Sequence, residues 1–326
     1  MAKQVEKKPE RKKNLAHIVL LALALLLPST MWMVFGWTSC FLPLLVFFFI
    51  NKYGWRYTNN HLVIAGPAAL FLGYLFQSLE LVFFSTALLP AGYAAAYAAQ
   101  RGDLPWQAGL KAWLTLCLSF FLFFGILLIN SEISFFQAVT ASLHHGIDEA
   151  LRQYRASDSL SAENFAMLEQ TLEQVKAGAP LIMPAILGGI LLLVSWVTLV
   201  LGNALLPKTG AAQPWPDYRC WCLPETLVWG LIISGVAAMI PGNMIRIAAI
   251  NCVIIITILY SFQGLAILAF LLDKWNIPRL VRSLIYIMII LQSFGTVLLI
   301  VAGVADVWFD IRRIHSEQKN DTTDTE

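Results

Sequence analysis

The 326-residue chain is 58% hydrophobic and 13% charged, with a mean hydropathy of +0.69 and a formal net charge of +2. A soluble domain needs more polar surface than this to cover its core. In lipid, by contrast, exposed side chains are apolar and the backbone pairs internally, in helices or in a closed barrel. The apolar runs, such as residues 18–27 and 253–259, are continuous and lack the alternation of barrel strands. The sequence therefore predicts an all-α, polytopic membrane protein whose apolar helices contact the lipid bilayer.

The amino-terminal tail, residues 1–14, carries six basic and two acidic residues. A basic flank of this kind stays in the cytoplasm according to the positive-inside rule. A cleaved signal peptide is the alternative interpretation, but no small-residue cleavage site follows and apolar sequence continues through residues 28–35. We therefore expect a multi-pass protein of the bacterial cytoplasmic (inner) membrane with its amino terminus in the cytoplasm.

Nine apolar segments are candidates for membrane-spanning helices, which need about 20 residues each. They lie at residues 15–35, 38–50, 61–76, 81–99, 107–129, 181–205, 225–240, 247–272 and 284–304. The second segment is short and contains Pro43, so that it can be tilted, broken or re-entrant. We therefore predict a bundle of eight or nine spans. Eight spans place Arg312 and Arg313 in the cytoplasm, and nine place them outside.

A polar segment at residues 130–178 interrupts the spans and has three basic and seven acidic residues, which is compatible with the extracytoplasmic side. Apolar residues recur at helical spacing in 136–151 and again in 165–175. Ser161 is a candidate N-cap for the second helix, and Gly178 is a candidate for its end. We predict an extracytoplasmic hairpin of two amphipathic helices lying over the outer membrane surface.

The predicted organisation has five parts. They are the basic tail (1–14), transmembrane helices 1–5 (15–129), the hairpin (130–178), transmembrane helices 6–9 (179–305), and a carboxyl-terminal motif with a flexible tail (306–326).

Four alanines at strict four-residue spacing lie in the fourth predicted span: Ala87, Ala91, Ala95 and Ala99. Small residues at this spacing let a second helix approach closely, which matters in lipid because no hydrophobic effect drives helices together. Two interpretations follow from this row. It either packs a helix inside the protein or forms a docking face for a partner membrane subunit.

Polar residues gather at the predicted extracytoplasmic ends of the spans. The candidate substrate-binding residues are Gln77, Glu80, Glu132, Asn243, Arg246 and Asn251. Ionisable groups in a membrane are costly and often mark a substrate path, although interfacial positions also tolerate them. Gln263 lies inside the eighth predicted span, where it must hydrogen-bond either to another helix or to something bound there.

No catalytic, metal-binding or nucleic-acid-binding pattern is evident. HExxH, GxSxG and Walker-type motifs do not occur. His144 and His145 precede two acidic residues by four positions, but Gly146 is expected to interrupt that helix and no further ligand is in view. The Cys220-x-Cys222 pair lacks a second pair of ligands. Basic residues beside the spans are explained by anionic lipid. We therefore expect no enzyme activity, cofactor, metal or nucleic acid.

The last third of the chain carries a set of short motifs. They are Leu223-Pro224-Glu225, Phe262-Gln263-Gly264-Leu265-Ala266-Ile267, the pair Arg279 and Arg282, and the closing run from Asp306 to Arg313 with Trp308 and Phe309. In these motifs the chain resembles the YybS-like family of bacterial membrane proteins, a domain of unknown function. That family distantly resembles the substrate-binding membrane subunits of energy-coupling-factor importers. The resemblance implies a small molecule bound from the outer side and a coupling protein docked through small-residue helix faces.

Two hypotheses from different classes follow. The first is a non-enzymatic, substrate-binding or transport-associated membrane subunit, with Arg246 holding an anionic group at the outer ends of the spans. The alternative is a membrane scaffold for cell-envelope machinery that binds a protein partner through the hairpin.

Overall fold

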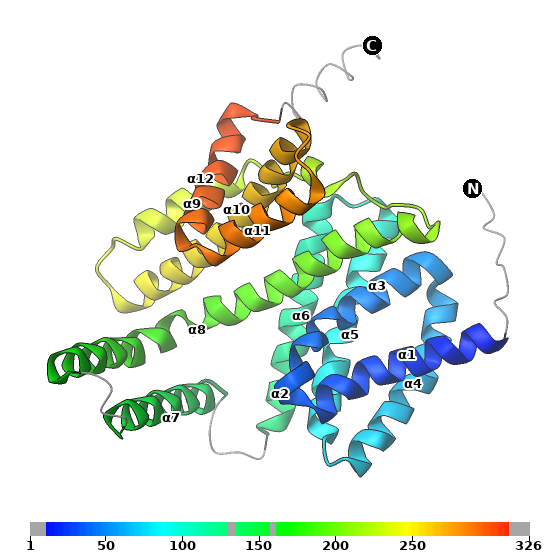
Figure 1. The fold of residues 1–326 in the computed structure, drawn as a ribbon, viewed down its shortest axis with the longest axis horizontal. Helices are drawn as coiled ribbons and strands as arrows, with labels where there is room; N and C mark the ends of the chain where they lie inside the picture. The colour runs from blue at the N-terminus through cyan, green and yellow to red at the C-terminus, as the bar shows by residue number, and fades with distance from the viewer. Residues whose placement is uncertain (1–10, 130–134, 157–160, 313–326) are drawn as a thin grey trace. The chain divides into compact units, whose positions relative to one another are not determined.

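The computed structural model describes residues 11–129, 135–156 and 161–312, and this part of the chain forms helices and turns without any strand (Figure 1). The predicted all-α class is thus confirmed for the described residues. The chain divides into two compact units. One comprises Met1–Phe123 with Leu191–Asp217, and the other comprises Phe124–Ile190 with Tyr218–Glu326.

In the first unit, long apolar helices pack against one another, some parallel and some antiparallel. Its elements are α1 (Arg11–Thr30), α2 (Trp32–Phe35), a 3₁₀ segment (Gly36–Phe41), α3 (Leu42–Tyr53), α4 (Trp55–Leu75), α5 (Leu79–Arg101), most of α6 (Pro105–Leu127), the end of α8 and a 3₁₀ turn (Pro207–Thr209). Helix α1 packs against α4, and α3 packs against α5. The core between them buries Leu25, Leu42, Val82, Leu116 and Val194.

Helix α4 runs beside α1 over the whole length of α1. Near the start of both helices, the Tyr57 hydroxyl donates to Asn14 Oδ1 at 3.0 Å and lies 2.7 Å from His17 Nδ1. At the other end, Tyr74 of α4 and Ser29 of α1 line the same cavity. The two helices are therefore parallel and cover the same distance.

The alanine row of α5 is covered by the chain's own helices. Ala91 and Ala95 are buried, and Ala91 belongs to the core cluster together with Leu42 of α3. The neighbouring Gly92 has no room for a side chain, because a Cβ there would lie 2.7 Å from Val46 Cβ. Small residues thus bring the backbones of α3 and α5 into close approach, which strengthens their dispersion contacts.

The second unit has its own set of helices. They are α7 (Phe135–Ala156), the first part of α8 (Ala162–Leu205), a 3₁₀ turn (Tyr218–Cys220), α9 (Leu227–Ala237), α10 (Asn243–Lys274), α11 (Arg279–Leu291) and α12 (Ser293–Phe309). Helices α10 and α12 make the most extensive contact in this unit. They meet through two glycines. A Cβ on Gly264 would lie 2.8 Å from Leu299 Cα, and a Cβ on Gly303 would collide with the Tyr260 carbonyl.

Asn251 of α10 repairs a break in the hydrogen-bond ladder of α8. The Ala185 amide donates to Asn251 Oδ1 at 2.8 Å, and Asn251 Nδ2 donates to the Leu181 carbonyl at 2.8 Å. In an unbroken helix these two backbone groups would bond to each other. Pro184 lies within this turn, and a proline ring displaces the preceding turn of a helix. The side-chain amide therefore satisfies both groups and ties α8 to α10.

Helix α7 and the start of α8 form a hairpin. Lys176 Nζ lies 2.5 Å from Asp148 Oδ1, and Arg155 Nη2 lies 3.3 Å from Glu169 Oε1. The hydrogen bond from Lys176 holds the pKa of Asp148 below its ordinary value. The Asn164 amide donates to Ser161 Oγ at 3.3 Å, which confirms the predicted N-cap. The side of the membrane on which the hairpin lies stays a prediction.

Two predicted helix breaks are wrong. Helix α8 does not end at Gly178 but continues to Leu205, and its total length from Ala162 is 44 residues. Helix α7 likewise runs through Gly146 without interruption. A glycine inside a helix costs only about 1 kcal/mol relative to alanine. In lipid, ending α8 there would leave carbonyl groups without partners, which costs more.

Six helical segments in the described residues are long and apolar enough to cross a membrane. They are Lys13–Thr30, Trp32–Tyr53, Leu79–Arg101, Pro105–Leu127, Glu163–Thr209 and Met244–Lys274. Counting Arg279–Ile289 and Phe294–Phe309, a pair bent by 101°, as one span makes seven, against the eight or nine predicted. Helix α9 has only 11 residues, and α4 begins with polar residues that include Arg56 and His61. Length and composition therefore support fewer spans than the sequence pattern indicates.

Replacing Asn251 by alanine should destabilise the second unit by about 1–3 kcal/mol, because it leaves the Leu181 carbonyl and the Ala185 amide without their partner. The measurement is the free energy of unfolding of the purified protein in detergent. Cys252→Ala is a suitable control, since Cys252 is the next residue on α10 and is exposed. Equal stability of Asn251→Ala and the unmodified protein would show that α8 closes its own ladder at this turn.

Candidate functional site

The first unit contains an open cavity of about 920 Å³ where α1, α2 and the turn between α4 and α5 meet. This volume is within the roughly 300–1,000 Å³ of small-molecule sites in proteins. The polar side chains that line it are Ser29, Thr30, Gln77, Ser78 and Glu80, and its aromatic lining comprises Trp32, Tyr74 and Phe76. Two of the residues predicted from the sequence, Gln77 and Glu80, therefore share one cavity.

The turn that presents Gln77 to the cavity is strained. The Ser78 amide donates to the Gly73 carbonyl at 2.8 Å, and the Gln77 amide donates to the Tyr74 carbonyl at 3.2 Å. These two bonds form the motif that normally ends a helix with a left-handed glycine. Here Gln77 occupies that position, with φ of 54°. A residue with a side chain costs roughly 1 kcal/mol or more in this conformation, and such strain is concentrated at functional sites.

The Ser78 hydroxyl is buried and has no hydrogen-bond partner in the described structure. Ser78 directly precedes α5, where a serine usually caps the helix, yet its side chain makes no capping bond. The hydroxyl of Ser29, on the opposite wall, bonds instead to the Leu25 carbonyl at 2.9 Å and to Ser85 Oγ at 3.2 Å. An unsatisfied buried hydroxyl costs about 1–3 kcal/mol. The Ser78 hydroxyl would gain a partner from a bound molecule only if its side chain turned toward the cavity.

The remaining predicted site residues belong to the second unit. Asn251 is committed to the α8 ladder, and Arg246 is exposed in the first turn of α10. Asn243 begins α10, and its side chain lies outside the description, as does Glu132. Gln263 is buried and hydrogen-bonded, as the sequence analysis expected. The other members of its polar network were not predicted from the sequence.

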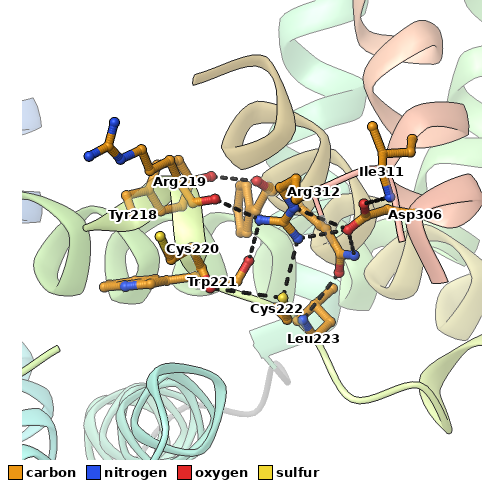
Figure 2. Close-up of polar contacts among 11 residues, drawn as sticks. Tyr218, Arg219, Cys220, Trp221, Cys222, Leu223, Asp306, Ile311 and Arg312 are labelled. Carbon is orange, nitrogen blue, oxygen red and sulfur yellow. Dashed lines mark hydrogen bonds and ion pairs between the residues drawn. The ribbon is translucent and has the colours of Figure 1, made fainter. Parts of the chain in front are cut away.

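This network is a clamp centred on Arg312, shown in Figure 2. Arg312 and Asp306 are 4% and 3% exposed, and Arg312 Nη2 lies 2.7 Å from Asp306 Oδ2. Asp310, with φ of 38°, reverses the chain after α12 and lets Arg312 return to Asp306. Gln263 Nε2 of α10 donates to the same carboxylate at 3.0 Å. The clamp thus joins α10 to the end of α12.

The clamp also fixes the segment that precedes α9. Arg312 Nη1 donates to the Arg219 carbonyl at 2.9 Å and to the Trp221 carbonyl at 2.8 Å, and Nη2 faces Cys222 Sγ at 3.4 Å (Figure 2). Together with the bonds from Nε and Nη2 to Asp306, these contacts use all five N–H groups of a guanidinium. A polar network that is satisfied in this way rigidifies a core and leaves no group for a ligand.

Both ends of the α11–α12 pair are anchored at the same place. Arg282 of α11 pairs with Asp273 at 3.1 Å, and Asp273 also pairs with Arg219. Arg312, beyond α12, bonds directly to the Arg219 carbonyl. The chain therefore leaves and returns to the same end of the second unit. The sequence pattern predicts that this end faces the cytoplasm; Arg313 lies outside the described residues.

The family model of predicted membrane proteins (DUF2232) matches residues 15–307 of the chain. The chain belongs to this family. No curated protein and no solved structure matches it. The region shared with DUF2232 contains the whole cavity and Asp306, and it ends before Arg312.

Replacing Arg312 by methionine should destabilise this DUF2232 protein by about 3–5 kcal/mol, because it leaves the Asp306 carboxylate buried without its counter-charge. Unfolding in detergent measures the loss, and Arg246→Met, at an exposed arginine, is the control.

The milder Arg312→Lys should loosen the segment around Cys222. Burial raises the pKa of the Cys222 thiol, while the charge of Arg312 lowers it. The clamp therefore protects the thiol only by keeping it buried.

Maleimide labelling of Cys222, with the other four cysteines replaced by serine, should therefore accelerate in Arg312→Lys. Unchanged labelling and unchanged stability would contradict the clamp.

Proposed function

We propose that this protein is a non-enzymatic, small-molecule-binding membrane subunit, of the substrate-binding or transport-associated kind, and that its site is the cavity between α1, α2 and the α4–α5 turn. The observation that carries the proposal is the convergence of the unpartnered Ser78 hydroxyl and the strained Gln77 on one open cavity. The left-handed conformation of Gln77 and the unpaired Ser78 hydroxyl both cost the fold free energy. A role of this turn in binding would account for that cost.

The resemblance to substrate-binding subunits of energy-coupling-factor importers that the sequence motifs suggest would agree with this proposal, because those proteins bind a small molecule from the outer side. The cavity lies at the end of α1 that is opposite to the basic tail. With the amino terminus in the cytoplasm, it opens toward the outside of the bacterial inner membrane.

A topology of eight crossings accompanies this function. Helix α4 is parallel to α1 and as long, which supports a crossing despite its polar start. The pair α11–α12 begins and ends beside Arg219, which supports a re-entrant segment. Hydrogen-bonded turns extend the short helix α9 to Pro224 at one end and to Ile240 at the other. With this longer segment as a crossing, the six apolar segments and α4 give eight. The hairpin is then extracytoplasmic and Arg312 is cytoplasmic.

Cysteine labelling in intact cells tests this topology, in a background without native cysteines. A membrane-impermeant maleimide should label Arg152→Cys on the hairpin from outside. Lys208→Cys, Arg279→Cys and Phe309→Cys should react only after permeabilisation. External labelling of Phe309→Cys alone would show that α11–α12 crosses the membrane, and protection of Arg152→Cys would remove the outward-facing cavity.

Binding itself is tested by the thermal stability of the purified protein against a panel of cationic, neutral and anionic amphiphiles. A ligand present at 100 times its Kd should stabilise the protein by about 2.7 kcal/mol. Ser78→Trp should weaken the stabilisation because the indole would occupy part of the cavity, whereas Leu118→Trp, on the exposed face of α6, should retain it. Gln77→Gly should stabilise the empty protein by about 1 kcal/mol and weaken binding.

The absence of any stabilising compound, or a shift that Ser78→Trp leaves unchanged, would refute the proposal. The alternative scaffold function is favoured by the apolar side chains that the hairpin leaves exposed, namely Phe136, Met167 and Val175. A photocrosslinker at Met167 that captures one defined protein, without any ligand effect, would support the scaffold instead.

A further inference from the structure

The lining of the cavity carries a net negative charge. Glu80 is its single charged side chain among the described residues, and no lysine, arginine or histidine lines it. The Glu80 side chain is exposed and makes no salt bridge within the described part of the chain. A bound molecule would therefore meet a carboxylate without a protein counter-charge.

The ends of the helices around the cavity make its electrostatic potential more negative still. The carboxyl-terminal ends of α1 and α4 contribute Thr30 and Tyr74 to the cavity, and a helix carries about half a negative charge at that end. The amino-terminal end of α5 contributes about half a positive charge, and Glu80 lies in its first turn. The sum of one carboxylate and these three helix ends is negative.

Aromatic rings make the cavity suitable for an organic cation rather than a metal ion. Trp32, Tyr74 and Phe76 line it, and the faces of such rings attract ammonium groups within roughly 6 Å. The Trp32 ring is held edge-on against Phe84, with the ring centroids 5.6 Å apart. No group of three or more metal-ligating side chains is present in the described structure. The side-chain amide of Gln77, which is exposed in the same lining, supplies a further acceptor for N–H donors.

From these observations, and resting on the proposed function, we infer that the cavity binds a small amphipathic organic cation, an amine or quaternary ammonium, with Glu80 as its counter-charge. The sign is opposite to the one that the sequence favoured, in which Arg246 holds an anion. Arg246 belongs to the second unit and does not line this cavity.

The test compares three probes of similar size: benzyltrimethylammonium, benzyl alcohol and benzoate. The cation should stabilise the purified protein most, and Glu80→Gln should weaken its binding about two- to fivefold, the magnitude of an exposed ion pair. Benzyl alcohol should bind weakly and equally to both proteins. Glu163→Gln, which removes an exposed carboxylate from the first turn of α8, should leave all three affinities unchanged, and Glu80→Lys should reverse the preference toward benzoate.

Glu80→Gln also removes a favourable charge from the start of α5, so binding is measured as the ligand-induced shift over each variant's own melting temperature. Preference for benzoate or benzyl alcohol in the unmodified protein, or an unchanged affinity for the cation in Glu80→Gln, overturns the inference. If binding of such a ligand is still weakened by Ser78→Trp, the proposed function survives. If no compound binds at the cavity, both fail.

Discussion

The structure depends on one constraint: in lipid, a backbone N–H or C=O group that loses its helical partner must find another inside the protein. Where α8 is interrupted near Pro184, the Asn251 side chain takes over both halves of the missing bond. In the extended segment before α9, Arg312 supplies donors to two carbonyls that no helix satisfies. At the end of α4 the backbone closes the turn itself. At these three places, the backbone groups that leave the helical pattern therefore find partners inside the protein.

The same constraint separates structural polar groups from functional ones. In the clamp, every N–H of Arg312 has an acceptor and Asp306 receives bonds from Gln263 and the Ile311 amide. A network so completely satisfied contributes rigidity and needs nothing else. In the cavity, the Ser78 hydroxyl is buried without a partner. Incomplete satisfaction is costly to the protein, and several other buried side-chain atoms in the described residues share it. What distinguishes Ser78 is its position in the lining of an open cavity.

Helices were predictable from continuous apolar runs, because period and length are local properties. The extent of α8 was not predictable in this way. Losing a backbone hydrogen bond inside lipid costs more than the weak preference of Gly178 to end a helix can supply. The Asp306–Arg312 pair could have been found from two charges six residues apart across a helix end, but its partners at Arg219 and Trp221 are about 90 residues away. Such partners follow only from the packing of α10 with α12.

The cavity shows why polar residues on one side of a membrane do not make a site. Sequence reasoning grouped Gln77, Glu80 and Arg246 because all three end spans on the same predicted side, and the group appeared to contain a cation for an anionic substrate. Helix packing decides which of them meet. The α4–α5 turn keeps Gln77 and Glu80 together because they are three residues apart in one rigid connection. Arg246 belongs to the other compact unit and does not line this cavity. The lining itself holds one carboxylate, two helix carboxyl termini and one helix amino terminus, which is why we infer a cationic ligand.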